Sequence, residues 1–285
     1  MAAEDGLEVW RGPGTGPPVV AVHGLEGSWS DWGPIAPRLP GGTPYALRLP
    51  WHAGTDFRWR REATPGEWLA RGLALVPEPP TTLMAHSFGA TVLLGHLSRL
   101  TEPPAGLSAV VLIAPVYRPA SLPVSDELYD GLLGLYRQVL RLGLEATLGP
   151  KAARMDPEIR TLMEERLLER AVSTGFPVFY EEYVASGAFA LTGIKVPTLV
   201  VAGTTDGGLP VERATALHEG LPSAEIRLRP EYGHFCHLEQ IPQLSEDIDQ
   251  FLSCAADTAA PPNRPVEAIR PAGQTEPPTR PGDHP

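Results

Sequence analysis

The chain has 285 residues and a formal net charge of −11, and 42% of its residues are hydrophobic. This length suffices for one large α/β domain with a buried core. The charge argues against nucleic acid or an anionic membrane surface as the principal partner, and no run approaches the roughly 18 apolar residues of a spanning helix. The cysteines, Cys236 and Cys254, fit a reducing compartment and give no metal framework. Because the N-terminus lacks a secretory pattern, we expect a cytoplasmic protein.

Seven apolar runs predict β-strands, and helical patterns lie between most of them. The runs are Leu7–Trp10, Val19–Val22, Tyr45–Leu49, Thr82–Ala85, Ala109–Ala114, Thr198–Ala202 and Ile226–Leu228. This alternation is typical of a mostly parallel, doubly wound sheet. A last helix is predicted at about residues 241–253, with an apolar face that would cover the sheet. Residues 257–285 contain eight prolines and few apolar side chains, so we expect a disordered tail.

A long segment without a strand pattern, residues 115–191, separates two of these strands. It contains two amphipathic helices, one beginning at Ser125 and the other capped by Asp156. A cluster of aromatic residues follows the second pattern and includes Phe179 and Tyr183. The predicted organisation is therefore a core made of residues 1–114 and 192–256, interrupted by a helical segment.

Ser87 lies between a predicted strand and a predicted helix, in the run Leu-Met-Ala-His-Ser-Phe-Gly-Ala. A serine at such a sharp turn stands above the sheet edge, where nearby backbone N–H groups point at the group it attacks. The turn requires small residues two positions to either side, and here they are Ala85 and Gly89. The strict pattern G-x-S-x-G has glycine in place of Ala85. We predict that Ser87 is a nucleophile; the alternative is a buried serine in a structural turn.

A nucleophilic serine needs a base within hydrogen-bond reach, and the base needs a carboxylate that orients it. His234 lies on the loop after the last predicted strand, and Asp206 follows the strand before it. Both therefore lie beyond the carboxyl ends of strands, where open α/β sheets place their chemistry. His237 and Glu231 are the competing base and acid. We favour the first pair because His237 falls in the next helical segment and Glu231 directly precedes the His234 loop.

The strand Val19–Val22 runs into the loop His-Gly-Leu-Glu-Gly at residues 23–27. The N–H groups of Leu25 in this loop and of Phe88 after the serine would converge on a substrate carbonyl oxygen. Further side chains are predicted to line a substrate pocket, with packing as the alternative role of each: His23, Trp51, His86, Phe179 and Tyr183.

Taken in this order, the motifs resemble the α/β-hydrolase superfamily over about residues 7–256. The resemblance implies an α/β-hydrolase fold with Ser87 as nucleophile, Asp206 as acid and His234 as base. It also implies that the Leu25 and Phe88 amides form an oxyanion hole. The helical segment at residues 115–191 resembles the lid of many hydrolases. We expect neither a cofactor nor a metal.

The segment Leu-Arg-Leu-Pro-Trp-His-Ala-Gly departs from the family's Asp-x-x-Gly-His-Gly pattern at Arg48 and Trp51, which leaves the substrate class open. We expect a serine hydrolase that cleaves an ester or thioester of an apolar acid, either a small molecule or carrier-bound, through an acyl-enzyme. One alternative keeps the fold but makes the protein an acyltransferase, cyclase or eliminase of secondary metabolism. The other is a non-catalytic ligand receptor. The oligomeric state is left open.

Overall fold

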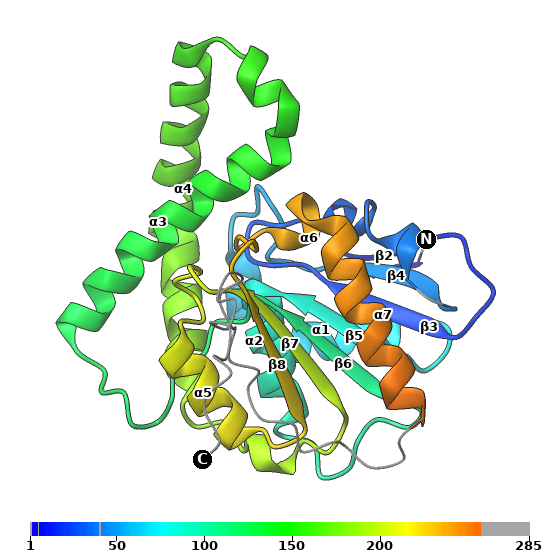
Figure 1. Cartoon of the computed structure of the whole chain (residues 1–285). Helices are drawn as coiled ribbons and strands as arrows, with labels where there is room; N and C mark the ends of the chain where they lie inside the picture. Colours follow the sequence, from blue (N-terminus) through cyan, green and yellow to red (C-terminus); the bar gives the residue numbers. More distant parts are fainter. Residues whose placement is uncertain (1, 5, 40, 258–285) are drawn as a thin grey trace, which may run out of the picture.

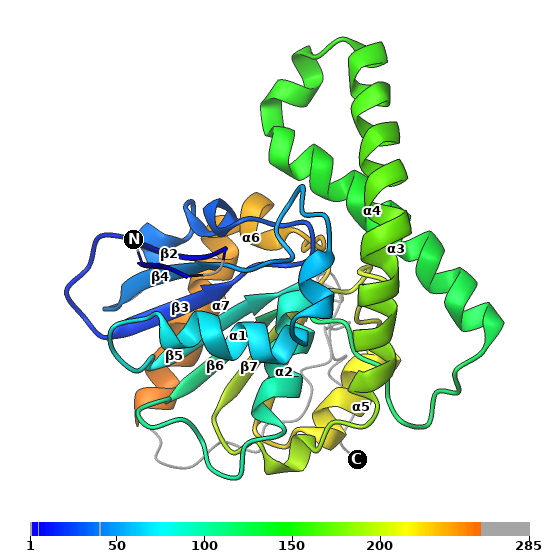
Figure 2. The same ribbon diagram turned by 180° about the vertical axis from the view of Figure 1, so that it is seen from behind.

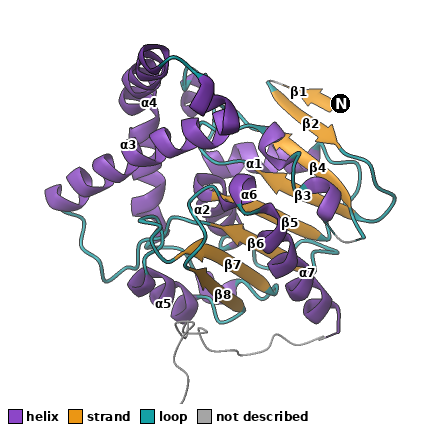
Figure 3. Cartoon of the chain, turned by 45° about the horizontal axis from the view of Figure 1, so that its top comes forward, coloured by secondary structure: helices purple, strands orange, loops and turns teal. Residues whose placement is uncertain are grey.

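The computed structural model describes residues 2–4, 6–39 and 41–257. Its centre is an eight-stranded sheet in the order β1-β2-β4-β3-β5-β6-β7-β8 (Figure 1). The run from β4 to β8 is parallel, whereas β2 pairs antiparallel with both β1 and β4. The strands fan from β1 at one edge to β8 at the other (Figure 3). Their bounds are Ala2–Glu4, Leu7–Arg11, Pro18–Val22, Thr43–Arg48, Thr82–His86, Ala109–Ile113, Thr198–Gly203 and Ala224–Arg229 for β1 to β8.

Helices cover both faces of this sheet because its central strands are buried on both sides. Val20 and Val22 of β3 belong to one apolar cluster, whereas Val19 and Ala21 belong to another, as the pleat requires. The first cluster packs under α1 (Pro65–Ala74), α2 (Ser87–Leu97) and α5 (Val211–Gly220), and Figure 2 shows α1 and α2 on this face. The second packs under α7 (Ile241–Asp257), which follows the short α6 (Cys236–Glu239).

Two long helices, α3 (Asp126–Leu148) and α4 (Pro157–Ser186), lie between β6 and β7. We call residues 126–186 the helical insertion. It rises beyond the carboxyl edge of the sheet, and its far end stands away from the sheet (Figure 1). Both helices begin at the predicted caps. The Ser125 hydroxyl accepts a hydrogen bond from a first-turn N–H of α3, and the Asp156 carboxylate does the same for α4.

The helix α4 is longer than the sequence pattern indicated, because it continues through Pro177. Proline ordinarily interrupts a helix, so burial must stabilise this one. Phe176 and Phe179 flank the proline and pack with Tyr136 of α3 in a separate apolar cluster. Phe179 and Tyr183, which were expected after the second helix, therefore lie on that helix.

The predicted strands are all present as β2 to β8, with ends that differ by no more than two residues. The short strand β1 was not predicted. Most of the expected disordered tail lies outside the described residues; its first residue, Asp257, ends α7. No helix in the described part of the chain is long and apolar enough to cross a membrane. Short 3₁₀ turns also occur: η1 Trp29–Trp32, η2 Ala36–Arg38, η3 Arg58–Arg61, η4 Gly149–Arg154 and η5 Leu191–Gly193.

Candidate active site

The turn between β5 and α2 presents Ser87 at the carboxyl edge of the sheet. Its backbone is left-handed, with φ +51°, a conformation that costs a non-glycine residue about 1–2 kcal/mol. The chain tolerates small neighbours only, because α2 packs directly on the loop after β3. A Cβ added to Gly89 would lie 2.4 Å from the carbonyl oxygen of His23. The methyl group of Ala85, by contrast, is fully buried in the sheet core, so this position accommodates alanine in place of the first glycine of the pattern.

The structure brings the three predicted chemical groups into one hydrogen-bonded chain. The His234 Nε2 lies 2.9 Å from the Ser87 Oγ. The other ring nitrogen, Nδ1, lies 3.0 and 3.1 Å from the two carboxylate oxygens of Asp206. The carboxylate fixes the tautomer: Nδ1–H donates to Asp206, which leaves Nε2 as the acceptor for the serine proton. This arrangement can activate Ser87 as a nucleophile.

The environment keeps the Asp206 carboxylate charged. Burial alone would raise its pKa, but the neighbouring His234 and the N–H of Gly208, at 2.9 Å, outweigh burial and lower the pKa below its ordinary value. The competing residues do not reach this chain. Glu231 is exposed, and His237 packs against the buried Trp32, where burial lowers its pKa to about 3.

The two predicted oxyanion donors both have free N–H groups. Neither the Leu25 nor the Phe88 N–H donates to an acceptor within the described residues. Phe88 belongs to the first turn of α2, whose helix dipole favours negative charge. The loop that carries Leu25 also lies against the serine, since a Cβ added to Gly24 would lie 3.3 Å from the Ser87 Cβ. Both segments that adjoin Ser87 therefore carry an unpaired backbone donor among the described residues.

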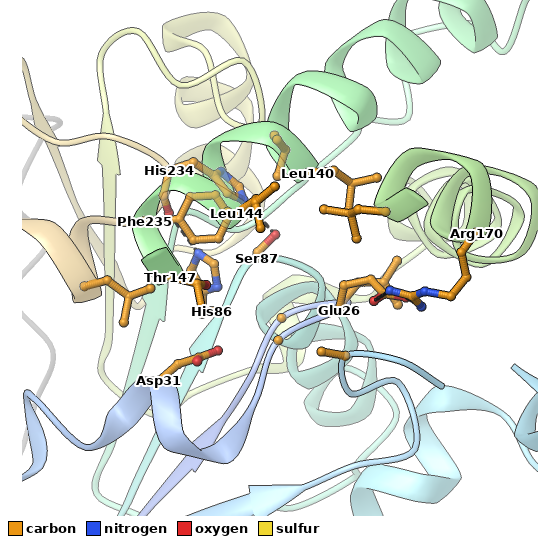
Figure 4. A pocket seen from close by; sticks show the side chains of 18 residues that line it. Glu26, Asp31, His86, Ser87, Leu140, Leu144, Thr147, Arg170, His234 and Phe235 are labelled. Carbon is orange, nitrogen blue, oxygen red and sulfur yellow. Dashed lines mark hydrogen bonds and ion pairs between the residues drawn. The ribbon is translucent and has the colours of Figure 1, made fainter. Parts of the chain in front are cut away.

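Two cavities adjoin Ser87 and His234. The main cavity, of about 200 Å³, lies between the loop after β3 and the helical insertion (Figure 4). It is lined by the ion-paired side chains of Glu26 and Arg170 and by apolar side chains of α3, including Leu140. A side chamber of about 30 Å³ is lined mainly by apolar and aromatic side chains. Its apolar and aromatic walls are Leu25, Phe88, Val116, Leu135, Tyr136, Val139, Leu140 and Phe179.

Two of the predicted pocket residues line these spaces. His86 borders the main cavity, where its Nε2 donates to the His234 carbonyl oxygen at 2.8 Å. Burial, with additional repulsion from its histidine neighbours, lowers the pKa of His86 well below its ordinary value, so the ring is neutral. Phe179 of α4 forms part of the side chamber.

The prediction that His23 and Trp51 line the pocket is corrected, because neither borders the main cavity or the side chamber. His23 is buried and connects two loops. Its Nε2 accepts from the Leu49 N–H at 3.0 Å, and its Nδ1 donates to the Gly24 carbonyl oxygen at 2.8 Å. Burial lowers its pKa to about 4. Trp51 lies beneath Phe88, with its indole N–H bonded to the His23 carbonyl oxygen at 3.2 Å. Both residues support the site from the core side.

Tyr183 is also misplaced by the sequence prediction. It is 1% exposed and borders neither cavity, because it lies one helical turn beyond Phe179 and packs behind it. The guanidinium of Arg213 lies over its ring at 5.5 Å. Its hydroxyl has no hydrogen-bond partner among the described atoms.

Sequence reasoning missed Glu26 and Arg170, which border the main cavity as an ion pair. Glu26 gave a usable signal, since it is a charged residue in a short loop directly after a buried strand. Arg170 gave none, because its helix carries many exposed charges. No group of three histidine, cysteine or acidic residues in the described chain is arranged to hold a metal ion.

Comparison with known proteins identifies the family. Residues 19–245 match the family model described as "Alpha/beta hydrolase family", and the chain therefore belongs to the α/β-hydrolase family. The sheet and its flanking helices have the α/β-hydrolase fold. No curated protein matches the sequence.

Several solved structures share this fold at low sequence identity. A meta-cleavage product hydrolase from Pseudomonas fluorescens, a mutant complexed with acetates, is 17% identical with a TM-score of 0.64, and the alignment covers 87% of this chain and 94% of that one. An esterase from Exiguobacterium antarcticum is 17% identical with a TM-score of 0.62, covering 87% and 95%. A thermophilic esterase from Thermogutta terrifontis is 20% identical with a TM-score of 0.58, covering 87% and 93%. These likenesses establish the fold alone.

The close contact at Gly89 yields a stability prediction. Gly89→Ala should lower the free energy of unfolding by about 1–3 kcal/mol, because the new methyl group must displace backbone at His23. Gly131→Ala is the matched control, since Gly131 also lies in a helix but faces open space. That substitution should leave stability unchanged or raise it by about 0.5–1 kcal/mol. Urea unfolding measures both; equal stabilities for the two variants would contradict the packing described here.

Proposed function

We propose that the protein is a serine hydrolase that cleaves a neutral ester or thioester of a small apolar acid. The observation that carries the proposal is the hydrogen-bonded chain from Ser87 through His234 to Asp206, beside two unpaired backbone N–H groups. Family membership supports a hydrolase, and the substrate class rests on the shape and lining of the cavities.

The geometry suggests the usual sequence of acyl transfer. As the Ser87 Oγ attacks the carbonyl carbon, His234 takes the serine proton and Asp206 stabilises the resulting imidazolium. The carbonyl oxygen becomes negative and accepts hydrogen bonds from the Leu25 and Phe88 N–H groups. His234 then gives its proton to the leaving group, whose bond to the carbonyl carbon breaks. Water repeats these steps on the acyl-enzyme and releases the acid.

The two cavities suggest how a substrate lies. We assign the acyl group to the side chamber, because its walls are apolar and enclosed by the helical insertion. The chamber is small, about 30 Å³ against about 200 Å³ for the main cavity, so we assign a short acyl chain to it. The leaving group would then occupy the larger cavity. In this proposal the insertion acts as a lid over the acyl chain.

The charges of the main cavity, Glu26, Asp31 and Arg170, disfavour an anionic substrate. Arg170 is the one lysine or arginine among its described lining residues, and both of its terminal nitrogens already bond to the Glu26 carboxylate. An anionic substrate would therefore find no free cation here. It would also lose hydration on entering an apolar space, which is costly for a charged group.

Removal of the nucleophile is the direct test of the chemistry. Ser87→Ala should reduce turnover of p-nitrophenyl acetate by about three to six orders of magnitude, and adding His234→Ala should cost little more, because the residues act as a unit. Ser173→Ala on the exposed face of α4 is the control and should retain full activity. A Ser87→Ala variant that is folded by circular dichroism and keeps more than a tenth of the activity would refute the proposal.

The size of the side chamber predicts acyl-chain selectivity. The wild type should prefer acetyl to butyryl esters over octanoyl esters, and Phe179→Ala should raise relative rates for longer chains by about 10–200-fold per accommodated group. Rates for acetate esters with increasingly long alcohols should keep their order. Tyr183→Phe is the control, because Tyr183 packs behind the chamber and its hydroxyl is unpartnered.

If Phe179→Ala instead changes the relative rates of acetate esters with different alcohols, the acyl group and the leaving group occupy the opposite cavities. If it changes the relative rates of neither set of esters, the side chamber does not bind substrate.

A further inference from the structure

Glu26 holds an unusual place in the site. It directly follows the oxyanion residue Leu25, and its backbone is left-handed, with φ +58°. A non-glycine residue adopts this conformation at a cost, and it persists only where the surroundings enforce it. One constraint is a hydrogen bond from the Glu26 N–H to the Trp51 carbonyl oxygen, 3.0 Å long.

The side chain supplies a second constraint. The Glu26 carboxylate accepts hydrogen bonds from Arg170 Nη1 at 2.8 Å and Nη2 at 2.6 Å, and from the Gly54 N–H at 3.3 Å. Its side chain is only 5% exposed, whereas that of Arg170 is 37% exposed. A carboxylate this deeply buried requires its counter-ion, and a two-pronged guanidinium contact also fixes its orientation. The hydrogen bond to Glu26 raises the pKa of Arg170 further, so the cation persists.

These contacts link the loop after β3, residues 23–27, to the helical insertion; we call this loop the oxyanion loop. Arg170 lies on α4, and the neighbouring Leu25 packs against both the sheet core and the apolar cluster of the insertion. Figure 4 shows Glu26 and Arg170 meeting beside Ser87. A second ion pair, Arg60 to Glu181 at 2.6 Å, also joins the core to α4, but its carboxylate is 65% exposed and its arginine lies in η3.

We propose that Glu26 is a positioning residue for the Leu25 oxyanion donor and that Arg170 holds it in place. This inference rests on the proposed function. Glu26 fixes the backbone that directs the Leu25 N–H toward Ser87, and it does so while α4 is seated on the loop. Arg170 also neutralises a carboxylate that would otherwise oppose the negative charge forming on the carbonyl oxygen. Hydrolysis therefore depends on the contact between α4 of the insertion and the oxyanion loop.

The rate of covalent labelling by a small fluorophosphonate tests this inference. Attack by Ser87 forms a bond to phosphorus and expels fluoride, and the phosphoryl oxygen occupies the oxyanion hole. Because removal of one whole oxyanion donor costs about 10²–10³-fold, a misdirected donor should slow labelling by about 10–100-fold. We expect this loss in Glu26→Gln and a larger loss in Arg170→Gln, which leaves a bare buried carboxylate. The double variant should react no more slowly than Arg170→Gln.

Kinetics on p-nitrophenyl acetate separate positioning from binding. In Glu26→Gln, kcat should fall by the same factor as the labelling rate, whereas KM should change by less than about threefold. Arg170→Lys keeps the charge but loses the paired contact, so it should recover part of the rate. Arg60→Gln and Glu181→Gln break the other link to α4 and are the matched controls; both should label at close to the wild-type rate.

The outcomes are distinguishable. A wild type that reacts rapidly at Ser87, together with a folded Glu26→Gln variant that reacts equally fast, overturns the inference and leaves the proposed function intact. Equal slowing in the Arg60→Gln control shows that general anchoring of α4 matters, which also overturns it. If the wild-type protein is not labelled at Ser87, the proposed function is wrong, and the inference that rests on it is wrong as well.

Discussion

The left-handed backbone at Ser87 is the constraint on which the site depends. The turn carries the chain from β5 into α2 within one residue, which places the hydroxyl above the sheet and the first N–H groups of α2 beside it. It also packs α2 against the loop after β3, and this contact leaves no room for a side chain at Gly89. The same contact brings Leu25, which lies in that loop, to the chamber that Ser87 borders. The candidate nucleophile and the candidate oxyanion donors are thus products of one local packing arrangement.

Burial determines how strongly the polar groups act on one another. His234 and Asp206 are both buried, so their interaction is weakly screened by water. The helical insertion supplies much of the enclosure, and its α4 reaches the oxyanion loop through Arg170. An enclosed site strengthens preorganised hydrogen bonds and excludes competing water. In the proposed function, the insertion therefore affects both the chemistry and the size of the acyl group that fits.

The sequence allowed the strands and the hydrogen-bonded residues to be predicted because each signal is local. Ser87, Asp206 and His234 each follow an apolar run, and strands in a parallel sheet end at a common edge. The pocket was harder to predict because side-chain direction depends on packing between distant elements. Trp51 closely follows the end of β4, so the sequence places it at the same edge of the sheet as Ser87. Its ring nevertheless points into the core beneath Phe88.

The ion pair between Glu26 and Arg170 was not predicted for the same reason. Its two residues are 144 positions apart, and nothing near Arg170 distinguishes it from other charges on α4.

The central claim is that Ser87 forms an acyl-enzyme, and direct trapping tests it. Wild-type protein mixed with p-nitrophenyl acetate and quenched in acid within milliseconds should gain the mass of one acetyl group. Peptide mass spectrometry should place that group on Ser87, and the Ser87→Ala variant should gain none. An acetyl group on another residue, or turnover by the wild type with the same adduct in the variant, would contradict the account.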